Sequence, residues 1–171
     1  MKCYSYLGRN GGEQELSLGR GCLYRGTVTH ELLHAVGFFY EHSRSDRDDY
    51  IDIFENHLLL TEFLSSFERG DPSHIRFLTK FDYQSVMLYG SDSFSRGPGL
   101  PSMLQKGGGT VKDVYDKPWL SEFDIIRIIA LYNSFISINS YYMRESAQTE
   151  NSRPVQGHYW NQDCDMHHVQ G

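Results

Sequence analysis

The sequence has little basic charge and no long hydrophobic run. Its 171 residues include 16 Lys and Arg against 22 Asp and Glu, which gives a formal net charge of -6. Such an excess of acid provides no general attraction to nucleic acid or anionic lipid, so a basic binding module is excluded. The longest apolar stretches, 57–64 and 125–132, are too short to span a bilayer. We therefore expect neither a nucleic-acid partner nor a membrane partner.

Cysteine is also scarce. Three cysteines allow at most one internal disulfide and leave one thiol over. Cys3 and Cys22 flank a glycine-rich segment and are the natural pair, with two reduced, buried thiols as the alternative. No apolar stretch follows the first lysine, so we expect no secretory signal in this sequence.

What the sequence does contain fits one globular domain. Hydrophobic residues make up 39% of the chain, enough for a core. Segments 4–7 and 14–18 are strand-like and separated by glycines, which predicts a small hairpin, and a further strand is expected at 102–105. The charged run 43–52 is typical of a solvated loop.

Two segments have helical periodicity. The first is 26–38, where Gly37 is placed to end a helix whose apolar positions are Val28, Leu32, Leu33, Ala35 and Val36. The second begins at Ser121, which with Asp124 forms a capping-box pattern, and runs to about Asn133 with Ile125, Ile128, Ile129 and Tyr132 at helical spacing.

The last part of the chain is polar and lacks a sustained period. We expect a folded domain over 1–134 and a polar tail over 135–171, because the tail has too few apolar residues to fold alone. The tail contains Cys164, His167 and His168, which offer at most an adventitious metal site.

The segment HELLH carries the chemistry. It places His30 and His34 four residues apart on the first predicted helix, so both imidazoles project from one face within reach of one metal ion. Glu31 then stands where metalloproteases of this pattern have the general base for a zinc-bound water. The alternative is a surface helix whose His and Glu merely face solvent.

The longer string HELLHAVGFFYEHSRSDRD, at 30–48, resembles the active-site signature of the astacin family of zinc endopeptidases, which are metzincins. CYSYLGRNGGEQELSLGRGC upstream, SVMLYG at 85–90 and LSEFDIIRIIALY near the end agree with the family in order and spacing. The resemblance implies an α+β fold: a partial N-terminal sheet with the active-site helix, then an irregular C-terminal subdomain with a Met-turn and one long helix. It also implies one Zn²⁺ ion, peptide or protein substrates and a secreted protein, and it leaves the oligomeric state open.

The resemblance also assigns roles. It implies that His30 and His34 bind zinc and that Glu31 moves the proton from the metal-bound water to the leaving amine. Met87, in the Met-turn segment 85–90, would pack under the metal. Tyr89 would be a weak fifth ligand that swings away to donate a hydrogen bond to the oxyanion.

The sequence departs from the family at several points. Tyr40 stands at the third zinc-ligand position in place of His. It would have to ligate as phenolate, and the neighbouring His42 is out of register. Another HExxH hydrolase would use a downstream acid such as Glu55 as third ligand. Roughly the first third of the family's catalytic domain has no counterpart here, and with it is missing the mature N-terminus that pairs with the position of Glu41. Ser134 stands where the family has a second disulfide. These departures favour an alternative, a catalytically impaired or truncated homologue.

Overall fold

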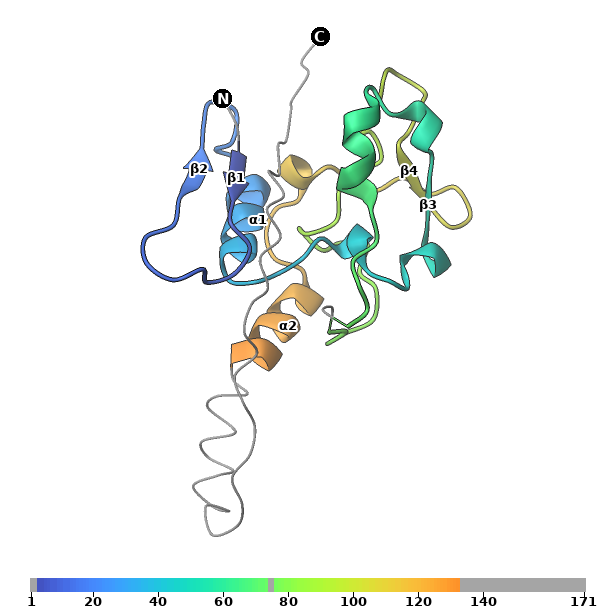
Figure 1. The fold of residues 1–171 in the computed structure, drawn as a ribbon. Coiled ribbons are helices and arrows are strands. Elements are labelled where there is room, and N and C mark those ends of the chain that lie inside the picture. The colour runs from blue at the N-terminus through green and yellow to red at the C-terminus, as the bar shows by residue number, and fades with distance from the viewer. Residues whose placement is uncertain (1–2, 74–75, 133–171) are drawn as a thin grey trace.

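The computed structural model describes residues 3–73 and 76–132 (Figure 1). The predicted tail, with Cys164, His167 and His168, lies outside the described residues, so the domain boundary at 134 stays a prediction. In the described part, no helix is both long enough and apolar enough to cross a membrane.

Two small antiparallel sheets flank the middle of the molecule. The first pairs β1 (Cys3–Ser5) with β2 (Leu16–Leu18) and confirms the predicted hairpin. The second pairs β3 (Ile51–Ile53) with β4 (Met103–Gln105), which lies within the strand expected at 102–105. In the described residues five short 3-10 helices lie in the connecting segments. Before β3 come η1 (Glu41–Ser43) and η2 (Arg47–Asp49), between β3 and β4 come η3 (Glu55–His57) and η4 (Thr61–Phe67), and after β4 comes η5 (Val114–Asp116).

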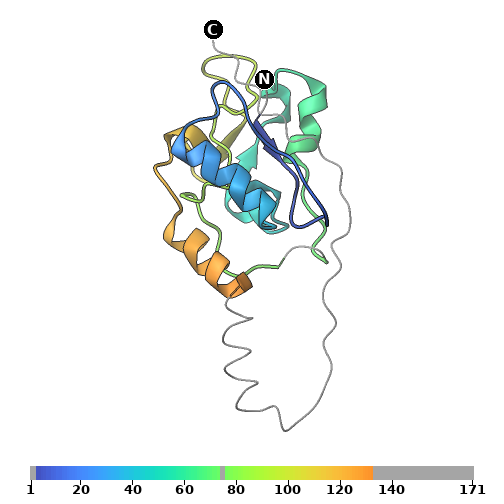
Figure 2. The ribbon, with the colours of Figure 1, turned by 90° about the vertical axis from the view of Figure 1, so that its left-hand side faces the viewer.

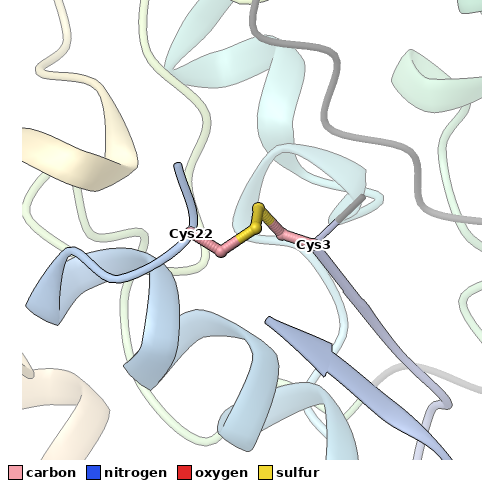
Figure 3. The surroundings of a disulfide bond; sticks show 2 residues. All are labelled: Cys3 and Cys22. Atoms are coloured by element: carbon pink, nitrogen blue, oxygen red, sulfur yellow. A yellow bond between two sulfur atoms is a disulfide. The ribbon is translucent and has the colours of Figure 1, made fainter. Parts of the chain in front are cut away.

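The hairpin is fastened to the chain that enters the first helix. A disulfide joins Cys3 in β1 to Cys22, just before that helix, as Figure 3 shows. The two cysteines lie 19 residues apart in the sequence. The expectation of a Cys3–Cys22 bond, rather than two reduced thiols, is confirmed.

Helix α1 (Arg25–Ala35) occupies the first predicted helical segment and ends where glycine permits a reversal. Gly37 has a φ of 105°, a left-handed conformation that costs glycine little. The Gly8 N–H donates to the carbonyl of His34 at 2.8 Å, so the turn of the hairpin packs on the end of the helix. The chain therefore turns sharply just beyond the HELLH segment.

The inward face of α1 is not the one that apolar periodicity indicates. Leu32 is 52% exposed and Val36 is also exposed, whereas His30, Glu31 and His34 are buried. Of the apolar positions, Leu33 packs in the core. The predicted helix is confirmed, and it turns its polar, chemistry-bearing side into the protein.

Helix α2 (Glu122–Tyr132) has the predicted N-terminal cap. The Asp124 N–H donates to Ser121 Oγ at 2.9 Å, and the Ser121 N–H donates to Asp124 Oδ2 at 3.1 Å, so the capping box is formed in both directions. Only part of its apolar side faces inward. Ile128 packs against the core, but Ile125 and Ile129 are exposed, while Asp124 and Arg127 are buried.

The charged run 43–52 is only partly a solvated loop, because Asp48 and Asp49 are exposed but its arginines are not. Arg44 and Arg47 are both buried, and Arg47 donates to the carbonyls of His42 and Phe67. Arg44 bonds the carboxylates of Glu41 and Asp46. Sequence alone missed this burial because the acceptors that compensate it are backbone carbonyls and acids brought together by folding.

The core has two clusters that meet at the Met-turn segment. The cluster beside α1 and α2 contains Leu33, Phe38, Val86 and Met87. The larger cluster, around β3 and β4, contains Ile51, Leu58, Phe67, Phe81, Leu88, Tyr89, Met103, Val111 and Val114. In the Met-turn segment, Val86 and Met87 thus belong to the first cluster, and Leu88 and Tyr89 belong to the larger one. The fold is α+β, as expected, with α1 and α2 on the same side of the molecule (Figure 2).

Candidate metal centre

The two histidines of α1 lie ring to ring inside the protein. The Nε2 atoms of His30 and His34 are 3.0 Å apart, and the ring planes are nearly perpendicular. Both side chains are buried. The spacing of one helical turn has therefore brought two nitrogen donors to one point.

The opposite nitrogen of each ring is held by a backbone carbonyl. His30 Nδ1 lies 2.7 Å from the carbonyl oxygen of Val86, and His34 Nδ1 lies 2.8 Å from that of Phe38. A carbonyl oxygen only accepts hydrogen bonds, so each Nδ1 carries the proton and donates it. In neutral rings both Nε2 atoms then present lone pairs to each other.

Facing lone pairs at 3.0 Å are stabilised by a cation between them. Burial lowers the pKa of His30 well below its usual value and lowers the pKa of His34 to about 4, so a proton does not supply that charge at neutral pH. Metal-bound histidines typically donate their other N–H to a carbonyl or carboxylate, as both rings do here. The donor pair therefore fits a metal ion such as Zn²⁺.

Glu31 is buried and stands next to His30 in the sequence. Burial raises the pKa of its carboxyl group to about 8, and its Oε2 atom has no hydrogen-bond partner. An acid with a pKa near neutrality can both accept and release a proton at physiological pH. A buried oxygen without a partner can accept a hydrogen bond from water or substrate, which suits a general base.

Three further rings surround the pair. The Tyr40 ring centroid lies 4.5 Å from that of His34 and 4.8 Å from that of Tyr89, while Tyr89 is stacked on His42 at 4.3 Å. The predicted site residues His30, His34, Tyr40 and Tyr89 are thus brought together. His42 instead binds the Ser66 carbonyl through Nε2 at 3.0 Å.

The alternative third ligands do not join the pair. Among residues 3–73 and 76–132, no group of three His, Cys, Asp or Glu side chains is arranged to hold a metal ion. Glu55, on η3, is exposed. Among the described residues, the Tyr40 phenol is therefore the candidate for the third donor, because it stands at the third-ligand position of the pattern and its ring lies beside that of His34.

The Met-turn segment is anchored by charged groups that sequence reasoning missed as site residues. Asp124 accepts from Ser85 Oγ at 2.6 Å and from the Val86 N–H at 3.0 Å. Lys117 Nζ donates to the carbonyls of Ser85 and Leu88. Met87 is fully buried, and its carbonyl accepts from the Glu41 N–H at 2.8 Å. The sequence offered Asp124 only as part of the Ser121–Asp124 capping box and gave no signal for Lys117.

The α+β fold, with paired imidazoles on the helix and a buried Met-turn segment whose Tyr89 ring lies beside that of Tyr40, defines a metzincin-like protein. A family model described as Astacin, a peptidase family, matches residues 1–133. The chain belongs to the astacin family.

Relatives agree in sequence and in structure. High choriolytic enzyme 1 of Oryzias latipes is 43% identical over 133 residues, which cover 77% of this chain and 47% of that protein. Its solved structure, described as a hatching enzyme zinc-protease, matches with a TM-score of 0.69 over 77% of this chain and 64% of that one. Zinc metalloproteinase nas-15 of Caenorhabditis elegans is 44% identical over 131 residues, 76% of this chain and 22% of that protein. The chain spans less than half the length of these two curated relatives.

Proposed function

We propose that this chain is a zinc-dependent metalloendopeptidase, which hydrolyses peptide bonds by means of a metal-activated water. The observation that carries the proposal is the pair of neutral imidazoles, whose Nε2 lone pairs face each other at 3.0 Å beside the buried Glu31. The names of the relatives, zinc metalloproteinase and zinc-protease, support zinc as the metal. His30 and His34 would hold the ion, with Tyr40 at the third position.

Each residue then has one task. Bound zinc would lower the pKa of a coordinated water and polarise the scissile carbonyl. Glu31 takes the proton from the water and passes it to the leaving amine. Tyr89 supplies a phenolic donor near the imidazoles for the developing oxyanion. Met87 packs in the core cluster with Leu33, Phe38 and Val86.

The substrates proposed are extended peptides or proteins, because a peptidase is what the family description names. We also propose that the protein acts in an oxidising compartment outside the cell. The Cys3–Cys22 disulfide supports this, since such bonds persist mainly in secreted proteins. Within the chain, residues 1–134 would form the protease domain and 135–171 its polar extension.

A second proposal is a catalytically impaired homologue that keeps the fold for binding. Tyr40 favours it, because a phenol with an intrinsic pKa of about 10 is a poorer zinc ligand at neutral pH than an imidazole. Catalytic zinc sites typically have three protein ligands. Without Tyr40, the described residues supply only two ligands to this site, His30 and His34.

One experiment separates the two proposals. The purified, dialysed chain is assayed for zinc by elemental analysis and for cleavage of an unstructured, fluorescently labelled protein. The peptidase proposal expects about one zinc per chain and cleavage that Glu31→Gln abolishes while retaining the metal. Glu55→Ala is the matched control and should change neither. Zinc without Glu31-dependent cleavage, or no zinc at all, would favour the impaired homologue.

A further inference from the structure

A buried lysine from outside both helices holds the Met-turn segment. Lys117 follows η5 and is 2% exposed. Its Nζ atom donates to the Ser85 carbonyl at 2.8 Å and to the Leu88 carbonyl at 2.6 Å. These two carbonyls belong to the first and last residues of a turn, since the Leu88 N–H itself donates to the Ser85 carbonyl. One ammonium therefore binds both ends of the turn.

The carbonyl inside this turn orients a proposed zinc ligand. Val86 lies between Ser85 and Leu88, and its oxygen accepts the hydrogen bond from His30 Nδ1 at 2.7 Å. This contact keeps the proton on Nδ1 and leaves Nε2 free to face His34. A shift of the turn would weaken that bond and lower the share of His30 in the metal-binding tautomer.

The lysine is fixed relative to the same helix that carries His30. A Cβ built on Gly26, in the first turn of α1, would lie 1.9 Å from the Val114 carbonyl oxygen and 2.7 Å from that of Lys117. Backbone at η5 thus lies directly against α1. The ammonium connects the turn to this backbone, whereas Asp124 holds other polar groups of the turn from α2.

We propose that Lys117 is a positioning residue of the metal centre. Its buried ammonium holds the Met-turn segment in the position where the Val86 carbonyl selects the Nδ1–H tautomer of His30. The lysine touches neither metal nor substrate. It acts through two carbonyls and one imidazole. The link to zinc rests on the proposed function, but the tautomer of His30 does not.

The test compares Lys117→Met with a destabilised variant that leaves the turn intact. Ile51→Ala serves as this control, because Ile51 is a fully buried core residue of β3 outside the turn. Two quantities are measured for each: the ¹⁵N chemical shifts of the imidazoles in the metal-free protein, and the Zn²⁺ affinity by competition with a chromophoric chelator. Thermal unfolding is recorded in parallel.

In Lys117→Met we expect His30 to become a mixture of tautomers and zinc affinity to fall about tenfold or more, the usual effect of losing an outer-shell contact. Ile51→Ala should retain the tautomer and bind zinc within about twofold of the unmodified chain, although it melts earlier. A Lys117→Met protein with an unchanged His30 tautomer overturns the proposal. So does a loss of zinc affinity that Ile51→Ala reproduces.

Further outcomes are also decisive. If the unmodified chain binds no zinc, the proposed function fails, while the imidazole shifts still decide whether Lys117 sets the tautomer. If Lys117→Met does not fold, Lys117→Arg and Lys117→Gln take its place. The proposal is supported if Lys117→Arg retains the Nδ1–H tautomer of His30 and Lys117→Gln loses it. It is overturned if the two variants show the same tautomer.

Discussion

Arg127 and Glu41 form a buried, two-bonded ion pair between residues 86 positions apart. Nη1 of Arg127 lies 2.7 Å from Glu41 Oε2, and Nη2 lies 2.7 Å from Oε1. Both side chains are almost fully buried. Because the Glu41 N–H donates to the Met87 carbonyl, the pair ties α2 to the Met-turn segment. The astacin resemblance implies a chain N-terminus at this carboxylate; here its donors are Arg127, Arg44 and the Asp82 N–H.

Removal of one partner should be costly. Arg127→Met leaves the Glu41 carboxylate buried with a weaker set of donors, and we expect a loss of about 3 kcal/mol in the free energy of unfolding, measured in urea. Arg127→Met combined with Glu41→Gln should recover at least half of this loss, since no buried charge is then uncompensated. Arg69→Met, which breaks the exposed pair with Asp48, should change stability by less than about 0.5 kcal/mol. Equal losses in the two arginine variants would contradict this expectation.

The third ligand position should respond to a single substitution. Tyr40→His restores an imidazole at the position where the family pattern has one, so zinc affinity should rise by at least about tenfold. Elemental analysis after dialysis against a graded series of chelators measures the change. Tyr40→Phe is the matched control and should bind zinc more weakly than the unmodified chain, because it lacks the phenol oxygen. If Tyr40→Phe binds as well as the parent, the phenol is not a ligand.

The carboxyl group of Glu31 should make the metal-free chain less stable as the pH rises. Its pKa is about 8 in the folded protein and near 4.5 when exposed, so between these values the folded state binds more protons than the unfolded state. The free energy of unfolding therefore falls with increasing pH across this window. Glu31→Gln should be more stable than the parent by about 3 kcal/mol at pH 7. At pH 4 the two chains should be nearly equal. Urea midpoints at both pH values, with chelator present, test the difference.

The disulfide should contribute most of the stability of the N-terminal hairpin region. In the chain-entropy description, opening a loop of this length costs about 3 kcal/mol. The double variant Cys3→Ser with Cys22→Ser should lose about that amount in urea unfolding. Cys164→Ser should leave the midpoint unchanged, because it leaves the Cys3–Cys22 bond in place. A stable double variant would show that β1 is held by its packing on α1 instead.

Local sequence signals predicted the elements well. The i, i+4 spacing of His30 and His34, the glycine that ends α1 and the Ser121–Asp124 capping box each lie within a few residues, so each could be recognised without the fold. The same signals did not show which side of each helix faces inward. Leu32, Ile125 and Ile129 are exposed although their spacing is helical, while Glu31, Asp124 and Arg127 are buried. The buried side of a helix depends on the segments that pack against it, and the tertiary fold sets these.

By itself the sequence determined the helix with two imidazoles, the hairpin and the family resemblance, and it singled out Cys3 and Cys22 as the natural pair; the structure decided that they are bonded. The tertiary structure alone decided which nitrogen of each histidine carries the proton, because that depends on the carbonyls of Val86 and Phe38. It also decided that Lys117 and Arg127 are buried. A charge can leave water only where acceptors from distant segments converge on it, and that convergence exists only in the folded chain.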